Sequence, residues 1–189
     1  MKFTPVLLAL SVSAVLSSGT ASAITGTTSA KMKFTSTVVT GTCTAKLVNG
    51  AGAETSEIGF GDVYRSDLVS QSRVEPLKIK FSSCSGVAKA TVSAQHGTGG
   101  GCSGGKANGT SFAAGLGTAF EVWSGDVDTG VILNCDSTDN PATSHDVAIT
   151  NGAGEFPMNS RIVIAYGRTI NDVGTGEVTA PVTFVVTYP

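Results

Sequence analysis

Short stretches in which apolar and polar residues alternate recur along this sequence. The clearest are residues 77–81, 89–94 and 182–188. A strand sends successive side chains to opposite faces, so each stretch predicts a strand with one face on a core and the other facing solvent. Less regular stretches give four further candidate strands: 38–44, 57–64, 119–124 and 161–167.

Turn-forming residues separate these stretches, and no segment carries the sustained apolar stripe of an amphipathic helix. Glycine, asparagine and aspartate lie between candidate strands, for example at Asn49-Gly50 and Asn151-Gly152. Such residues favour tight turns. Many short strands joined by glycine-rich turns predict an all-β fold, an antiparallel sandwich.

The N-terminus has the layout of a secretory signal peptide. Lys2 is followed by an apolar run, residues 6–16, and then by small residues that end at Ala21-Ser22-Ala23. This order predicts export and cleavage after Ala23. A membrane anchor is the alternative, but the run is shorter than the roughly 20 apolar residues that a spanning helix needs. We therefore predict that residues 1–23 are a signal peptide.

The segment that would begin the mature chain alternates along its whole length. From residue 24 to residue 34 the odd positions are polar or charged, and at about 3.3 Å per residue the segment would extend about 36 Å. Two interpretations fit equally: a first strand of the domain's own sandwich, or a strand that leaves the domain. The even positions are apolar or small: Ile24, Gly26, Thr28, Ala30, Met32 and Phe34.

Composition and charge narrow the class of protein. The chain has 189 residues, with 12 Lys and Arg against 14 Asp and Glu, and its net charge of −2 fits one mildly acidic domain. It has no basic cluster, so neither nucleic acid nor an anionic membrane surface is an expected partner.

Four cysteines follow the predicted signal peptide, at Cys43, Cys84, Cys102 and Cys135. In an exported protein, an even number of cysteines indicates disulfides. A metal site is the alternative, yet no C-x-x-C pair occurs and only His96 and His145 could add imidazole ligands. Four cysteines allow three connectivities, which stay open at this point.

Motifs that suggest catalysis or cofactor binding are weak. The glycine-rich segment, residues 97–109, matches fragments of nucleotide-binding and hydrolase motifs, but each of those needs a following helix and none is predicted. No acid and base pair occurs at a recognisable spacing, so we predict neither an enzyme nor a cofactor nor a metal. Asp126 and Asp128 are expected to bond to nearby turn backbone. Trp123, the single tryptophan, is expected in the core.

Four blocks of sequence carry a family resemblance. Residues 34–43, FTSTVVTGTC, match an F-x-G-x-V pattern that runs to a first cysteine, and residues 58–63, IGFGDV, follow. Residues 77–84, LKIKFSSC, end in a second cysteine, and residues 180–189, APVTFVVTYP, have a penultimate tyrosine. In this order and spacing the blocks resemble the type 1 family of chaperone–usher fimbrial subunits.

The resemblance implies an incomplete immunoglobulin-like β-sandwich, residues 36–189, that lacks its last strand. Residues 24–35 would be a donor-strand extension that fills the groove of a neighbouring subunit, while the extension of the next subunit fills the groove of this one. A periplasmic chaperone would occupy the groove first, and an outer-membrane usher would exchange the chaperone for the extension. The implied groove and chaperone-binding positions are Val182, Phe184, Val186, Tyr188 and Pro189.

The implied function is polymerisation, with copies of itself or related pilin subunits, into an adhesive fibre on the cell surface. The alternative is a single-domain tip adhesin that binds a host receptor through its loops. The family's disulfide corresponds to Cys43–Cys84, which leaves Cys102 to pair with Cys135. The chain departs from the family at Ser36, where glycine is usual.

Overall fold

The structure is a computed structural model that describes residues 35–36, 40–103, 110–135 and 141–189. Val38–Pro189 forms one unit. Met1–Thr37 forms another and falls almost wholly outside the described residues, so the signal peptide and the extension stay predictions. Among the helices that the structure describes, none is long and apolar enough to cross a membrane.

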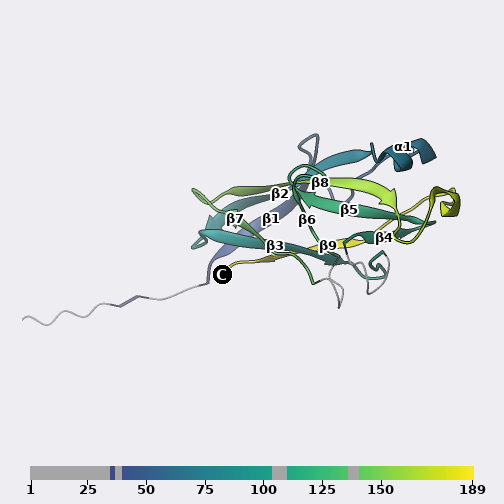
Figure 1. Ribbon diagram of the computed structural model, residues 1–189. Coiled ribbons are helices and arrows are strands. Elements are labelled where there is room, and N and C mark those ends of the chain that lie inside the picture. The colour runs from purple at the N-terminus through teal and green to yellow at the C-terminus, as the bar shows by residue number, and fades with distance from the viewer. Residues whose placement is uncertain (1–34, 37–39, 104–109, 136–140) are drawn as a thin grey trace, which may run out of the picture. The chain divides into compact units, whose positions relative to one another are not determined.

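The strands pair into two antiparallel sheets (Figure 1). The first sheet contains β1 (Thr42–Asn49), β2 (Val74–Ser85), β8 (Gly154–Ile164), β5 (Thr118–Ser124) and β4 (Phe112–Gly115) in that order, with β6 (Val131–Ile132) beside β5. The second sheet has the order β7 (His145–Ala148), β3 (Lys89–His96), β9 (Val182–Thr187). Two short helices, α1 (Arg65–Ser70) and η2 (Ile170–Asp172), lie at one end, opposite the end where β9 finishes.

The apolar residues of the alternating stretches are buried between the two sheets. On β2, Leu77, Ile79 and Phe81 point into the space between the sheets and are all buried. Across that space, the inward residues of β3 are fully buried, and both sets belong to the main hydrophobic cluster. Because the strands pack this cluster between them, the predicted all-β sandwich is confirmed.

The strand predicted at 57–64 is wrong. Residues 57–64 contain no strand pairing, although Phe60 is buried and its ring centroid lies 4.9 Å from that of Phe120. The Arg73 guanidinium donates a hydrogen bond to the Phe60 carbonyl, so a side chain takes the place of a ladder partner. Two other predicted strands are displaced: β1 begins at Thr42 and continues to Asn49, and β8 begins at Gly154 and ends at Ile164.

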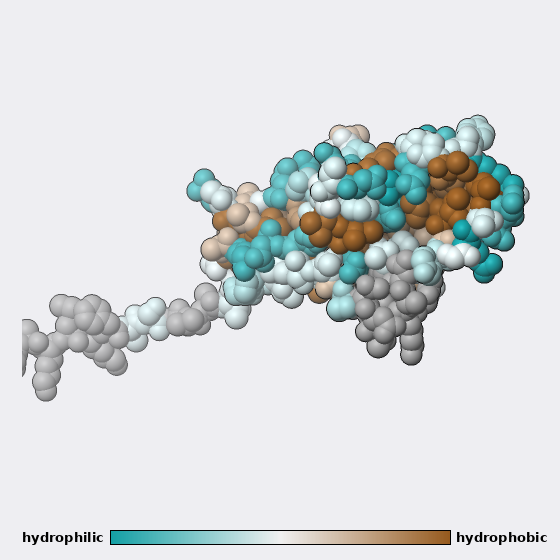
Figure 2. All heavy atoms as spheres, in the orientation of Figure 1, coloured by the Kyte–Doolittle hydropathy of each residue, from teal (hydrophilic) through white to brown (hydrophobic). Residues whose placement is uncertain are grey.

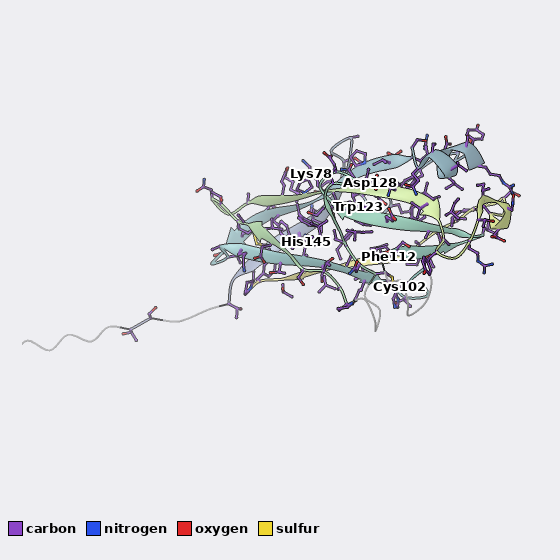
Figure 3. The ribbon with its side chains drawn as sticks, viewed as in Figure 1. Lys78, Cys102, Phe112, Trp123, Asp128 and His145 are labelled. Atoms are coloured by element: carbon purple, nitrogen blue, oxygen red, sulfur yellow. A yellow bond between two sulfur atoms is a disulfide. The ribbon has the colours of Figure 1, made fainter. Side chains whose placement is uncertain are left out.

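The expectations for Trp123 and Asp128 are also wrong. Trp123 is half-buried on the outer face of the first sheet, where the Arg161 guanidinium carbon lies 5.8 Å from its ring centre (Figure 3). Arg161 donates to the Glu121 carboxylate at 2.8 Å and to both oxygens of Asp128 at 2.7 and 2.9 Å. Hydrogen bonds from Arg161 lower the pKa of Asp128. The ion pair between Asp128 and the buried Arg161 therefore holds this turn, together with a backbone hydrogen bond from the Gly130 N–H to the Asp126 carbonyl at 2.7 Å.

Two disulfides link the sandwich, in the pairing that the resemblance implied. Cys43–Cys84 joins β1 to β2, with 4.1 Å between the two Cα atoms. Cys102–Cys135, with 5.6 Å between Cα atoms, joins the β3–β4 connection to the β6–β7 connection. Both connections pass from one sheet to the other, so the second bridge ties the sheets together away from β1.

A candidate strand-acceptor groove

A groove of about 1220 Å³ opens between the two sheets beside the start of β9. Residues 56–64 form one wall, and residues 173–184 form the other. Only the end of the second wall, Val182–Phe184, belongs to a strand. The groove is therefore bordered mainly by extended chain that has not been incorporated into either sheet.

The floor of the groove is apolar and comes from the first sheet. Leu47, Leu77, Phe120, Val122 and Ile162 line it from four strands. Leu77 and Val122 belong to the main hydrophobic cluster, whereas Ile162 belongs to a second cluster beside α1. Two separate clusters in a sandwich of this size indicate that the groove interrupts the core, and an apolar cleft of this kind marks a binding surface.

In the second sheet, β9 also has an edge without a partner strand. It pairs with β3 along one edge only. Its inward residues Val182, Phe184 and Val186 stay half-buried, although Ala94 and Val92, which pair with Phe184 and Val186, are fully buried. An edge strand with apolar side chains and unused backbone groups is a template for another strand.

The positions that the resemblance assigned to the groove do not all lie in it. Val182 and Phe184 line the groove. Val186 and Tyr188 pack instead on the main cluster, and the Tyr188 hydroxyl donates to the Cys43 carbonyl at 3.5 Å, while Pro189 is exposed. The predicted donor positions in residues 24–34 lie outside the described residues.

The backbone of both walls is largely unpaired. Among the described residues, the N–H groups of residues 58–63 and 175–180 donate no hydrogen bond to other backbone groups. Most residues of these stretches are exposed, and the unpaired N–H and C=O groups of an exposed extended segment can accept another strand. Two unpaired stretches that face one groove are therefore the arrangement that a strand inserted between them would complete.

Contacts at the wall ends keep the groove open and formed. The Arg65 guanidinium donates to the Val173 carbonyl at 2.6 Å, and the Gly174 N–H donates to the Leu116 carbonyl at 3.0 Å. At the other end of this wall, the Gly97 N–H donates to the Pro181 carbonyl at 2.8 Å. These bonds anchor the wall at its ends and leave its middle free to pair.

Exposed apolar side chains border the end of the groove. Four of the five large apolar residues that are exposed in the described chain lie around α1, the β4–β5 turn and the loop before η2: Tyr64, Val69, Leu116 and Tyr166. Figure 2 shows apolar surface gathered at this end of the molecule. Apolar surface of this kind is typical of contact with another protein.

The described residues give no support for a metal site or for the motifs that the glycine-rich segment matches. The described residues contain no group of three or more His, Cys, Asp or Glu side chains placed to hold a metal ion. The glycine-rich segment is pinned at Cys102 and is followed by β4, not by the helix that its motif matches require. The sequence did not predict that residues 173–181 form a wall of the groove. The only marked feature of this segment in the sequence is its glycines, Gly174 and Gly176.

Comparison with known proteins identifies the family of this chain and a solved structure with the same fold. No family model matches the chain. A solved structure of a chaperone–usher pilus aligns over 85% of this chain and 96% of that chain, with a TM-score of 0.54 and 18% identity. The fimbrial-like protein YadL of Escherichia coli (strain K12) is 33% identical over 200 residues, which cover 100% of this chain and 99% of the relative. The chain belongs to the same family as this fimbrial-like protein.

The solved chaperone–usher pilus has the same fold as this fimbrial subunit. The P pilus rod subunit PapA also aligns, over 71% of this chain and 93% of that chain, with a TM-score of 0.49 and 14% identity. The 33%-identical relative is named as a fimbrial-like protein, and the solved pilus shares the fold. Both the predicted family and the predicted structural role are confirmed.

Proposed function

We propose that this subunit polymerises by strand addition, accepting the extension of a neighbouring subunit in its groove and donating its own residues 24–34 to another. The observation that carries the proposal is the pair of unpaired backbone walls on either side of an apolar floor. An extended strand laid between them would bond to both walls, and its alternate side chains would reach the floor.

The length and pattern of the extension support this assignment. Residues 173–184 of the wall span 12 positions and residues 24–34 of the extension span 11, so the two segments are similar in length. The even positions of the extension end in Met32 and Phe34, two large apolar side chains that would pack in the gap between the two hydrophobic clusters. Filling that gap would join the clusters into one core.

The same groove explains the need for assembly partners. An open apolar groove with free edges promotes aggregation until it is covered. We infer that a periplasmic chaperone covers it after residues 1–23 are removed, and that an outer-membrane usher exchanges the chaperone for an extension. On this proposal residues 24–35 are the donor segment and residues 36–189 the acceptor domain.

Assembly of purified chaperone-bound subunits into ladders that resist SDS tests the proposal. Met32→Lys should abolish the ladders, because an unpaired ammonium group would enter an apolar groove at a cost of several kcal/mol. Ser29→Lys places the same charge on the opposite face of the extension, and its ladders should form normally. Unchanged ladders from Met32→Lys would refute the proposal.

A deletion separates a donated strand from a strand of the domain's own sandwich. Removing residues 24–32 should leave the circular dichroism spectrum of the chaperone-bound subunit unchanged while ending its ability to donate. If those residues belong to the subunit's own core, each large apolar side chain removed costs roughly 2–5 kcal/mol and the domain should unfold. An unfolded deletion variant would therefore contradict the assignment.

A further inference from the structure

The charged residues that line the groove all have the same sign. They are Glu57, Asp62 and Glu177, and no lysine or arginine is among the described residues that line the groove. Glu57 and Asp62 lie on one wall and Glu177 on the other, and all three side chains are exposed at the rim. An occupant of the groove therefore lies between acidic edges on both sides.

These three carboxylates differ from most others in the molecule. Within the described residues, none of the three forms an ion pair, whereas Glu54, Glu121 and Glu155 each pair with lysine or arginine. Carboxylates at other exposed positions are also engaged, since Asp146 bonds to Lys89. The three rim carboxylates thus have no ion-pair partner among the described residues, although the Arg65 and Arg73 guanidinium groups bond to the wall carbonyls of Val173 and Phe60.

The extension carries the complementary charge. Its two charged residues are Lys31 and Lys33, both at odd positions, on the face opposite Met32. A strand that directs its even side chains to the groove floor directs its odd side chains outward, level with the rim. In a register that brings residues 31–33 level with Asp62 or Glu177, the lysines would stand between the two acidic edges.

We propose that Lys31 and Lys33 of the incoming subunit and the rim carboxylates Glu57, Asp62 and Glu177 select the partner by charge, so that a second copy of this chain is the preferred donor. This proposal rests on the strand-addition function above and names the residues that determine its specificity. The apolar even positions supply the binding contact, and the charges decide which extension enters fast enough to displace the chaperone.

The physics favours an effect on the rate of entry more than on final stability. Neighbouring strands lie about 4.8 Å apart, within the screening length of about 8 Å at physiological ionic strength. Exposed ion pairs add little to affinity, but complementary potentials steer encounter and change association rates strongly. Reversing both lysines should therefore slow entry by roughly tenfold at low salt.

The rate of entry of a labelled synthetic peptide, residues 24–35, into the full-length chaperone-bound subunit measures this effect. A peptide carrying Lys31→Glu and Lys33→Glu should enter roughly tenfold more slowly at low salt, and the difference should shrink at high salt. A subunit carrying Asp62→Lys and Glu177→Lys should restore fast entry of the reversed peptide and slow the natural one.

A matched control separates local charge from net charge. Glu54→Lys and Glu155→Lys change the net charge of the subunit equally but lie outside the groove, so they should not rescue the reversed peptide. Equal rates for natural and reversed peptides, or equal rescue by the control subunit, would overturn the charge selection while leaving strand addition intact. Failure of the natural peptide to enter at all would overturn both proposals.

Discussion

Removing the Cys102–Cys135 disulfide is expected to lower the free energy of unfolding by roughly 3–4 kcal/mol. The bridge closes a loop with a sequence separation of 33 residues. In the chain-entropy account, a cross-link of this span takes roughly 12–13 cal/mol/K from the unfolded chain, which is worth about 3.7 kcal/mol at 25 °C. The stabilisation therefore acts chiefly on the unfolded state.

The folded structure around Cys102 does not depend on the bridge alone. The Ala113 N–H donates to the Gly101 carbonyl and the Ser103 N–H donates to the Ser111 carbonyl, each at 2.8 Å. These bonds fix the start of β4 against the glycine-rich segment. Without the bridge, the subunit should therefore keep its fold and its groove while losing stability.

Urea unfolding of the subunit with its groove filled by a peptide of residues 24–35 measures the loss. Cys135 is fully buried, so Cys102→Ala with Cys135→Ala removes packing as well as the bond. Reduction of the natural protein would also open Cys43–Cys84, so the oxidised and reduced forms of a Cys43→Ala, Cys84→Ala variant, which keeps only Cys102–Cys135, are compared to isolate the contribution of the bond. A loss below about 1 kcal/mol on reduction would refute the entropy argument, because a cross-link of this span cannot then be constraining the unfolded chain.

Two further predictions concern buried polar groups. His145 packs against Phe156, its Nε2 atom is buried without a hydrogen-bond partner among the described residues, and burial lowers its pKa. Because the folded protein then binds a proton less readily than the unfolded chain, stability should be full above about pH 6.5 and should fall as the pH drops from 6.5 towards 5, as followed by urea unfolding. Arg161→Met should cost roughly 3 kcal/mol in the same assay, because it leaves the Glu121 carboxylate, whose side chain is 18% exposed, without its cation.

Each of these predictions has a control within the chain. His145→Gln should remove the decline between pH 6.5 and 5, whereas His96→Gln, at an exposed position, should keep it; a decline unchanged in His145→Gln would exclude this residue as the cause. Glu121→Gln added to Arg161→Met should recover part of the loss, since the uncompensated charge is gone. A double variant as unstable as the single one would assign the loss to packing against Trp123.

Strands whose neighbours lie on both sides were predictable from the sequence. Residues 77–81 alternate and form the buried centre of β2, which pairs with β1 and β8. Residues 89–94 likewise fall within β3, between β7 and β9. A strand that is paired along both edges needs an uninterrupted run of strand-forming residues. The alternation of apolar and polar residues is therefore regular enough to be recognised in the sequence.

Features that depend on distant partners were not predictable. Arg161 occupies an outward position of β8 that alternation assigns to solvent, yet Glu121, Asp128 and the Trp123 ring enclose it, and its exposure is only 4%. The short strands β4, β6 and β7 carry too few residues for a period to be recognised. Their pairing is set by the longer strands beside them.

The incorrect strand at 57–64 has a different origin. Ile58 and Phe60 alternate with glycines and point toward the hydrophobic clusters, as in a strand, but residues 58–63 have no ladder in the described structure. Residues 182–188 show the same mismatch more weakly, since their strand pairs on one edge only. Side-chain alternation shows which face of a segment is apolar, but it does not show whether the backbone has a hydrogen-bonding partner. In the proposed fibre a neighbour's extension supplies that partner to both walls at once, so the strand pattern in this segment describes the assembled state and not the isolated subunit.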